Sequence, residues 1–402
     1  MSKTKAVFSS AIVLYFIIGF EILIMISPFA GFFYAAFNPL LLYLVQHPAT
    51  RWLTAFFLPH MVSPPDVFLK TIRVSGSVLF IAGLLTFFSC AFQVYFNKFF
   101  KKGVALRGLY SYIRHPQYFG LGLTGLGLAI LWPRFLVLAL WNLMMVIYYF
   151  LARDEERRMI GQHASGYRAY MDKTGMFVPR MVENALRKVP FPRSRLVRTA
   201  FSFFLMLSLS LGGAFLLRGY TINNLPLWYE APVATLALLP NDLAKAEHRM
   251  TSVLQLPEIA SRLQKIKGPF LVYFMPTDYV MQGMIADTGG EWQLYKRHHT
   301  VAMISDWIFH PFRHLKGGHA MMHHNGEQHD MGNKPAGNGV TRRMIFLQIV
   351  SDEPVLPSAL FGINARRVPL FMADVEIHNL ELIAVQDLPS ETGWGRVPTP
   401  TF

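Results

Sequence analysis

The first half of the chain consists of long apolar blocks separated by short polar segments. From Phe8 to Val45 the single charged residue is Glu21, and Pro28 interrupts the run. About 20 helical residues cross a bilayer, so this run is long enough for two crossings. We therefore expect membrane helices at residues 8–27 and 29–46.

Further apolar segments follow the same logic. Residues 75–96 and 199–217 are each long enough to span, whereas residues 52–62 either re-enter or lie at the interface because they are too short. Two apolar segments joined by Pro133-Arg134, residues 117–132 and 135–152, predict a tight helical hairpin. The pattern indicates a polytopic all-α membrane bundle of about five to six transmembrane helices.

The last 184 residues have ordinary polar density and no apolar stretch long enough to span. We expect a helix at 241–266, strands at 269–275, 343–350 and 369–386, and a long loop at 324–340. The predicted organisation is a membrane domain over residues 1–218 and a separate extramembrane domain, α+β or mainly β, over residues 219–402.

The distribution of charged residues predicts how the chain is oriented in the membrane. The chain is 52% hydrophobic and 15% charged, with a net charge of +14, and residues 98–198 hold 17 Lys/Arg against 5 Asp/Glu. Because membrane helices interrupt this basic stretch, we interpret it as a cytoplasmic face rather than a nucleic-acid surface. The protein is then integral to a bacterial inner membrane or the endoplasmic reticulum, with residues 219–402 on the opposite, periplasmic or lumenal, face. Arg51, Lys70 and Arg73 fit this orientation less well.

Cysteine restricts the chemistry. The chain has one cysteine, Cys90, inside an apolar run. No disulfide within the chain and no cysteine-based zinc site can form.

Two polar clusters occur where the predicted hairpin meets the basic face. Residues 108–120 place Arg114, His115 and Tyr118 at the entry to the first hairpin helix, and residues 153–158 place Glu155 and Glu156 at the end of the second. Each cluster alone is typical of an interfacial anchor or a solvated helix end. The hairpin returns both to one membrane side, so we expect a small-molecule site there.

A third polar segment follows the second cluster. It contains Tyr167-Arg168-Ala169-Tyr170 and then Pro179-Arg180. The alternative interpretation of this segment is a helix lying on anionic lipid.

Together the motifs resemble the isoprenylcysteine carboxyl methyltransferase and phospholipid methyltransferase family. Arg-His-Pro-x-Tyr-x-Gly, a membrane hairpin, Glu-Glu, Tyr-x-x-Tyr and Pro-Arg occur in the family's order over roughly residues 75–182. The resemblance implies S-adenosylmethionine as cofactor and a lipid or lipidated substrate. The cofactor-binding residues that it implies are Arg114, His115, Gln117, Tyr118, Gly120, Leu121, Glu155, Glu156, Tyr167 and Tyr170.

Carboxylates and Tyr rings suit this cofactor because it carries a sulfonium cation. A carboxylate acceptor needs a cation to hold it, which Arg153 or Arg180 would supply, and no general base. An amine acceptor must lose a proton, and Glu156 would then be the base. The residues leave both acceptors open. Gly120, Gly122, Gly125 and Gly127 lie in an apolar helix without a preceding strand, so they predict close helix packing rather than a dinucleotide site.

Eight of the fourteen histidines fall between His298 and His329. The pairs His310/His314 and His319/His323 have the i, i+4 spacing of two ligands on a helix. This spacing raises the hypothesis of a transition-metal site, against the alternative of a polar loop that happens to be rich in histidine.

Three functional hypotheses remain. The first is S-adenosylmethionine-dependent methylation of a lipid-soluble acceptor resembling an isoprenylcysteine carboxylate. The second is methylation of a phospholipid amine or a small thiol. The third is a membrane-anchored metal-binding or sensing module with a degenerate helical half, which the intact Arg-His-Pro and Glu-Glu motifs disfavour.

Overall fold

The computed structural model divides the chain into two compact units, one helical and ending at Asn223, the other containing a sheet. Residues 61–65 group with the sheet unit. The structure describes residues 39–63, 66–162, 164–187, 194–266, 268–277, 279, 341–350, 359–363 and 365–388. The helix expected at 8–27, most of the one at 29–46, the loop at 324–340 and the His-rich segment lie outside these residues.

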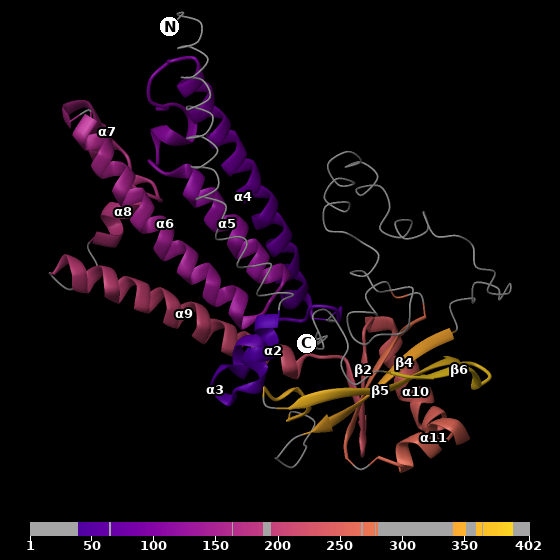
Figure 1. The fold of residues 1–402 in the computed structure, drawn as a ribbon. Helices are drawn as coiled ribbons and strands as arrows, with labels where there is room; N and C mark the ends of the chain where they lie inside the picture. Colours follow the sequence, from indigo (N-terminus) through magenta and orange to yellow (C-terminus); the bar gives the residue numbers. More distant parts are fainter. Residues whose placement is uncertain are drawn as a thin grey trace, which may run out of the picture. The chain divides into compact units, whose positions relative to one another are not determined.

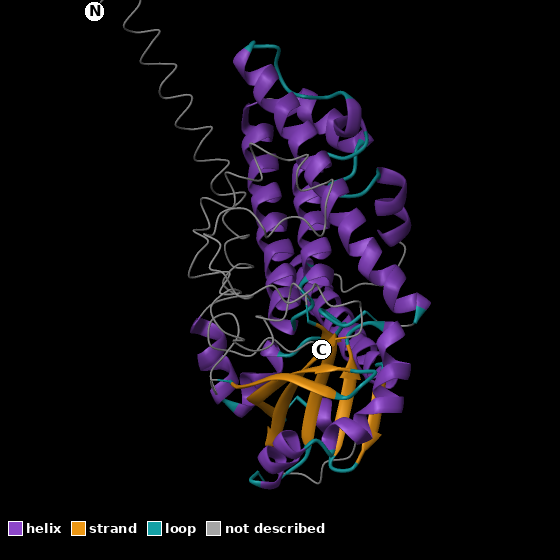
Figure 2. Cartoon of the chain, turned by 90° about the vertical axis from the view of Figure 1, so that its right-hand side faces the viewer, coloured by secondary structure: helices purple, strands orange, loops and turns teal. Residues whose placement is uncertain are grey.

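The helical unit contains three long helices and several shorter ones (Figures 1 and 2). They are α2 (Pro39–Gln46), α3 (Pro48–Arg51), α4 (Val67–Phe99), α5 (Pro116–Leu131), α6 (Phe135–Gln162), α7 (Ala164–Lys173), α8 (Arg180–Arg187) and α9 (Arg195–Asn223). Single 3-10 turns occupy Trp52–Thr54 and Gly108–Ser111.

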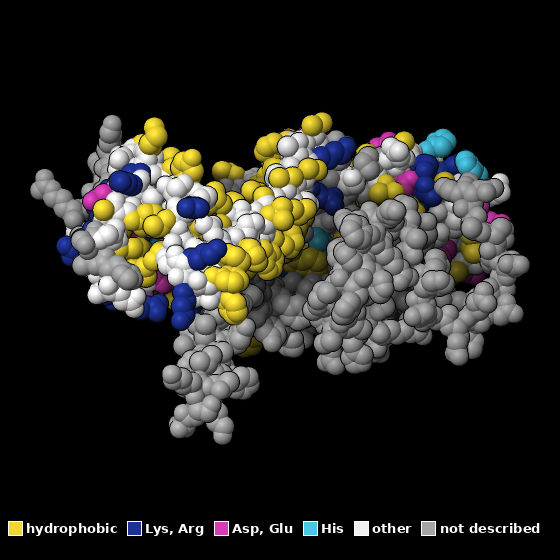
Figure 3. Space-filling model, turned by 90° about the horizontal axis from the view of Figure 1, so that it is seen from above, with side chains coloured by type: hydrophobic (Ala, Val, Ile, Leu, Met, Phe, Trp, Pro, Cys, Tyr) yellow, Lys and Arg dark blue, Asp and Glu magenta, His cyan; other side chains and the backbone are white. Residues whose placement is uncertain are grey.

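Among the described residues, three helices are long and apolar enough to cross a membrane: Val67–Phe99, Phe135–Gln162 and Leu196–Asn223. Helix α5 has 16 residues, about 24 Å of length, and pairs with α6 as the expected hairpin. The outer surface of the unit carries many exposed apolar side chains, such as Phe88 and Phe92 (Figure 3). These features indicate an integral membrane protein, while the expected total of five to six spans stays a prediction.

Helices α4 and α5 approach each other closely because glycines face the contact. A Cβ at Gly127 would lie 2.5 Å from the backbone nitrogen of Phe80, and one at Gly120 would lie 2.8 Å from that of Phe87. Neither position admits a side chain without moving a backbone. The expectation of close packing at these glycines is confirmed for Gly120 and Gly127.

Helix α9 joins α6 through a polar pair within the apolar region. The Asn142 side-chain amide donates to Ser210 Oγ at 2.9 Å, and the Ser210 hydroxyl lies 3.1 Å from Asn142 Oδ1. Phe135 also stacks on Phe215, with ring centroids 4.4 Å apart. These contacts attach α9 to the hairpin.

The second unit is a six-stranded sheet with order β1-β2-β3-β4-β5-β6. The strands are β1 (Leu227–Glu230), β2 (Val233–Ala237), β3 (Phe270–Pro276), β4 (Thr341–Val350), β5 (Arg366–Glu376) and β6 (Glu381–Asp387). Strands β2 and β3 pair in parallel, and the other neighbours are antiparallel. The parallel connection contains α10 (Leu243–Leu254) and α11 (Pro257–Gln264), which pack on the sheet around Met250, Val253 and Ile259. The C-terminal region is therefore a sheet-containing unit, as expected.

Candidate active site

The Arg-His-Pro motif forms the start of α5. Pro116 occupies its first turn, a position that suits proline because the N–H there has no helical partner, and His115 is the preceding residue. The backbone before α5 pairs with the segment after α7: the N–H of Arg114 donates to the carbonyl of Gly175 at 2.9 Å, and that of His115 to Met176 at 3.2 Å. This pairing ties the end of α7 to the start of α5.

Helix α6 brings the Glu-Glu pair to the same place. It continues past the apolar residues to Gln162, so Glu155 and Glu156 lie within the helix rather than after it. The Arg114 Nε lies 2.6 Å from Glu156 Oε1, and both side chains are largely buried, 5% and 12% exposed. The two motifs, which are about forty residues apart in sequence, are in direct contact.

His115 lies between the two carboxylates. Its Nδ1 is 3.3 Å from Glu155 Oε2, and its Nε2 is 3.4 Å from Glu156 Oε1. Burial alone would lower the pKa of His115, but hydrogen bonds to Glu155 and Glu156 and their negative charges outweigh it, so the pKa is raised. The site thus favours an imidazolium between two carboxylates.

Tyr118 completes the contact with Glu155. Its hydroxyl donates to Glu155 Oε1 at 2.5 Å, and its ring stacks on Tyr148 with centroids 5.0 Å apart. The Glu155 side chain remains 41% exposed, in contrast to Glu156. Glu155 is consequently the carboxylate that a ligand can reach.

Arg114 also holds α7. Its Nη1 donates to the carbonyl of Met171 at 3.2 Å and to the carbonyl of Thr174. With Nε on Glu156, the guanidinium connects the end of α6 with the last turn of α7 and the residue after it. A guanidinium makes this connection well because its donors are fixed in one plane.

The two tyrosines of α7 lie over this network. Tyr167 is buried and close enough to Glu156 and Arg114 for their charges to act on its pKa, which burial raises. The Tyr170 hydroxyl donates to the carbonyl of Tyr110 at 2.6 Å, and burial raises its pKa to about 12. Both remain neutral phenols at physiological pH.

Three further predicted cofactor residues lie on the first two turns of α5. Gln117 has a buried side-chain nitrogen, Nε2, without a hydrogen-bond partner in the part of the chain that the structure describes. Leu121 is buried. Gly120 faces α4, where its hydrogen atoms leave room for the backbone of Phe87.

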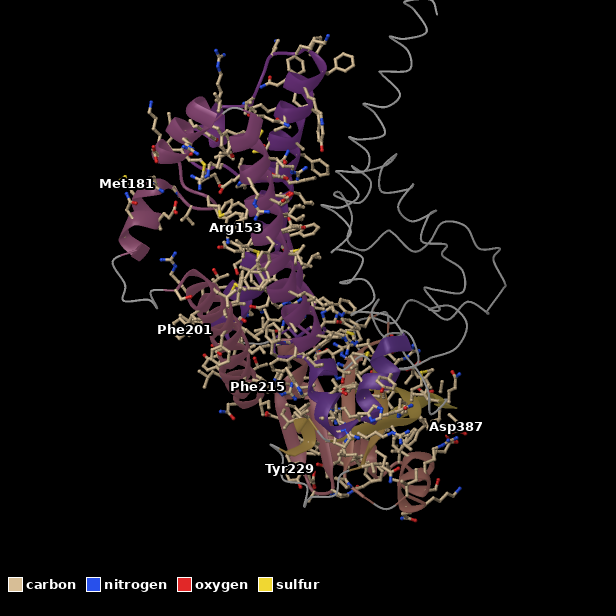
Figure 4. All side chains as sticks on the ribbon, turned by 60° about the vertical axis from the view of Figure 1, so that its left-hand side comes forward. Arg153, Met181, Phe201, Phe215, Tyr229 and Asp387 are labelled. Atoms are coloured by element: carbon tan, nitrogen blue, oxygen red, sulfur yellow. The ribbon has the colours of Figure 1, made fainter. Side chains whose placement is uncertain are left out.

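The predicted acceptor-binding arginines stand apart from the network. Arg153 is exposed on α6 (labelled in Figure 4) and lies over the ring of Tyr149 at 5.8 Å. Arg180 on α8 pairs with Glu183 at 3.5 Å. Across the described ranges, no ion pair joins either arginine to Glu155 or Glu156.

Sequence reasoning missed the segment after α7. A Cβ at Gly175 would lie 1.8 Å from the carbonyl oxygen of Val178, so no other residue fits there without moving the backbone. The carbonyl of Thr174 accepts a hydrogen bond from the Arg114 guanidinium, and the carbonyl of Gly175 accepts one from the Arg114 backbone N–H. A glycine after a predicted helix is an ordinary stop signal, so it did not indicate this role.

No histidine/carboxylate group that could hold a metal occurs among the described residues. His310, His314, His319 and His323 lie outside them, so the metal hypothesis stays a prediction.

Comparison with known proteins connects this geometry to a family. Residues 71–164 match the family model of phospholipid methyltransferases. No curated protein matches the chain, and no solved structure does. The matched segment includes nearly all of α4, α5 and α6, and with them Arg114, His115, Tyr118, Glu155 and Glu156. The resemblance noted in the sequence is thus confirmed: residues 71–164 match the phospholipid methyltransferase family model, in a chain whose apolar helices indicate an integral membrane protein.

Proposed function

We propose that the helical unit transfers a methyl group from S-adenosylmethionine to a lipid-soluble acceptor. The observation that carries this proposal is the contact of His115 with both Glu155 and Glu156 at one end of a membrane hairpin, inside the segment that matches the family. The arrangement supports a site for a cation at the boundary of the apolar region.

The residues fit this cofactor. S-adenosylmethionine has a sulfonium, an ammonium, a carboxylate and ribose hydroxyls, and when bound it supplies an electrophilic methyl group. Glu155 is partly exposed and suits a cation, while the unpaired Nε2 of Gln117 suits an oxygen of the ligand. We propose that Tyr167 and Tyr170 cover the pocket and that Tyr118 provides an aromatic face.

Within this proposal, Arg114 is a positioning residue. Its guanidinium is 5% exposed and donates to Glu156 and to carbonyls next to the end of α7. We infer that it acts on the cofactor through Glu156 and through the placement of Tyr167, rather than by touching the ligand.

The hydrogen bonding of the site favours an acceptor that needs no general base. Glu156 is neutralised by Arg114, and the raised pKa of His115 favours its protonated form. A carboxylate acceptor resembling that of an isoprenylcysteine uses its oxygen lone pair to form the new C–O bond, while the carbon–sulfur bond breaks with its electrons going to sulfur. We propose Arg153 and Arg180 as the cations that hold such a carboxylate.

The second candidate is a phospholipid amine, which the name of the matching family model favours. An amine must be deprotonated before it attacks, and the partly exposed Glu155 would be the base in this case. A small thiol acceptor places the same demand on the site.

The stability of the transferred methyl group separates these acceptors. Purified full-length protein is incubated with S-adenosylmethionine labelled in its methyl group and either a farnesylcysteine analogue or phosphatidylethanolamine. A carboxylate acceptor yields a methyl ester that releases the label in mild alkali, whereas an N-methyl product keeps it. Glu155→Gln should abolish labelling, and the matched control Asp154→Asn, on an exposed carboxylate paired with Arg158, should retain it. Alkali-stable label in phospholipid would overturn the carboxylate assignment.

We further propose that the site faces the cytoplasm and that the C-terminal unit lies on the opposite face, since the basic residues collect in 98–198. In a Cys90→Ala background, a cysteine at Ser194 should react with an impermeant thiol reagent from the cytoplasmic side alone. A cysteine at Ser261 should react from the other side alone. Labelling of both from one side would refute the topology.

A further inference from the structure

The loop between α4 and α5 carries exposed positive charge without a matching negative charge. Lys101, Lys102 and Arg107 are all exposed. The sequence has no aspartate or glutamate between Val67 and Arg153, and no described carboxylate forms an ion pair with any of the three cations. The dipole of α4 stabilises Lys101 and Lys102, which follow the helix end, but it acts only over the last turn and does not reach Arg107.

Hydrogen bonds attach both ends of this loop to α4. The N–H of Lys102 donates to the carbonyl of Asn97 at 2.9 Å. The side-chain amide of Gln93 donates to the carbonyl of Arg107 at 3.1 Å. The three cations are therefore held at one end of the same helix.

Exposed apolar side chains lie next to these cations in the chain. Phe99, Phe100 and Leu106 are 56%, 54% and 49% exposed. The Nζ of Lys102 lies over the ring of Phe96 at 4.8 Å and over that of Phe100 at 5.7 Å. Rings and alkyl chains with cationic ends are typical of the boundary between hydrocarbon and headgroups. Because α4 is long and apolar enough to cross a membrane, the loop follows directly after a crossing.

The same loop leads directly into the candidate active site. Arg107 immediately precedes the 3-10 turn Gly108–Ser111, and Arg114 follows shortly after this turn. Within the turn, the carbonyl of Tyr110 accepts the hydroxyl of Tyr170 on α7 at 2.6 Å. A ligand that holds Arg107 would therefore also restrain the segment that contacts α7 and presents Arg114.

We propose that Lys101, Lys102 and Arg107 bind the phosphates of anionic phospholipids in the surrounding bilayer, and that this binding strengthens the cofactor site. The second part rests on the proposed function. A membrane surface fits these cations better than a soluble anion does, because the exposed apolar side chains beside them gain from burial in lipid. Recognition is by charge, so phosphatidylglycerol and phosphatidylserine should bind alike.

Native mass spectrometry of the full-length protein in detergent tests the lipid site. Wild type should bind phosphatidylglycerol and phosphatidylserine at least about tenfold more tightly than phosphatidylcholine. The combined variant Lys101→Gln, Lys102→Gln and Arg107→Gln should lose most of this preference. The combined variant Lys101→Arg, Lys102→Arg and Arg107→Lys keeps the charge and should keep the preference.

A second control removes exposed cations of the sheet unit. Lys265→Gln combined with Arg366→Gln should leave the lipid preference unchanged. No preference in wild type, or an unchanged preference in the glutamine variant of the loop, would overturn the proposal. Displacement of the lipid by millimolar inorganic phosphate would show a free-phosphate site instead.

Nanodiscs measure the effect on the cofactor site. Binding of S-adenosylmethionine is compared in phosphatidylcholine alone and in an equimolar mixture of phosphatidylcholine and phosphatidylglycerol. The cofactor has a net positive charge and concentrates at any anionic surface, so the deciding comparison is between wild type and the glutamine variant of the loop in the same membrane. In the mixture the variant should bind at least about fivefold more weakly, and in phosphatidylcholine the two proteins should bind alike.

The sign of this effect separates it from direct electrostatics. Removing three positive charges would by itself strengthen the binding of a cation, so weaker binding by the variant has another cause. Equal binding by the two proteins in the mixture would refute the coupling. Absence of binding by wild type in both membranes would refute the proposed function and the coupling with it, while mass spectrometry still decides the lipid site.

Discussion

Replacing Arg114 by methionine should detach α7 from the carboxylates Glu155 and Glu156, because methionine keeps the unbranched apolar part of the arginine side chain but not its guanidinium. The change removes the 2.6 Å contact with Glu156 and the bonds to the carbonyls of Met171 and Thr174. Glu156, 12% exposed in its side chain, is left without its guanidinium partner. A hydrogen bond to a charged group contributes about 1.5–3 kcal/mol.

That magnitude sets the expected effect on binding. Since about 1.4 kcal/mol is a factor of ten, loss of the Glu156 contact should weaken S-adenosylmethionine binding by roughly 10- to 150-fold. Loss of the two carbonyl contacts should release residues 164–175, so their backbone amides should exchange faster with solvent. Arg114→Lys keeps the charge but not the planar set of donors, and we expect it to restore affinity in part.

Calorimetry in detergent measures the affinity, and hydrogen exchange measures the release of α7. Arg157→Met is the matched control, because Arg157 is 76% exposed and pairs with Asp154 at 3.6 Å, an ion pair of small energy. An Arg114→Met protein with wild-type affinity and wild-type exchange in residues 164–175 would refute the positioning role.

Three further predictions concern pH, helix packing and metal. Because the folded protein raises the pKa of His115, the stabilisation from this residue is complete below about pH 6.5 and is lost as pH rises through the raised value. Thermal unfolding from pH 5 to 9 should therefore show that the stability difference between wild type and His115→Gln shrinks with rising pH. A stability difference that grows with rising pH would contradict the assignment. Gly127→Val should lower the free energy of unfolding by at least about 1–3 kcal/mol, because its Cβ would lie 2.5 Å from the backbone of Phe80. The control Gly212→Val on α9, where a Cβ would meet nothing within 4 Å, should leave the free energy of unfolding nearly unchanged. Denaturation in detergent compares the two variants. Chelators should leave methyl transfer unchanged, because the histidines of residues 298–329 have no part in the proposed chemistry. Complete loss of activity with a chelator would contradict the proposal that the helical unit alone carries out methyl transfer.

Much of the site followed from the sequence because the hairpin is short and regular. Two apolar segments around Pro133-Arg134 required antiparallel helices, and this alone placed Arg114 and His115 beside Glu155 and Glu156. The ion-pair partners could not be assigned, since adjacent residues on α6 point in directions about 100° apart and the register of α5 against α6 depends on packing.

Other features depend on contacts that leave no periodic signal. Gly175 is required by a backbone approach from Val178, and its pairing with Arg114 crosses sixty residues. Strands β1 and β2 have four and five residues, too short for an alternation to be recognised. Helix α6 extends ten residues past the predicted end, since arginine and glutamate are good helix formers even where the apolar pattern stops.

Binding of S-adenosylmethionine to the purified full-length protein tests the central claim most directly. We predict measurable binding by calorimetry for wild type and a loss of affinity greater than tenfold in both His115→Ala and Glu156→Ala, because each variant removes a partner from the buried network. No binding by wild type, or unchanged affinity in both variants, would contradict the assignment of the cofactor site.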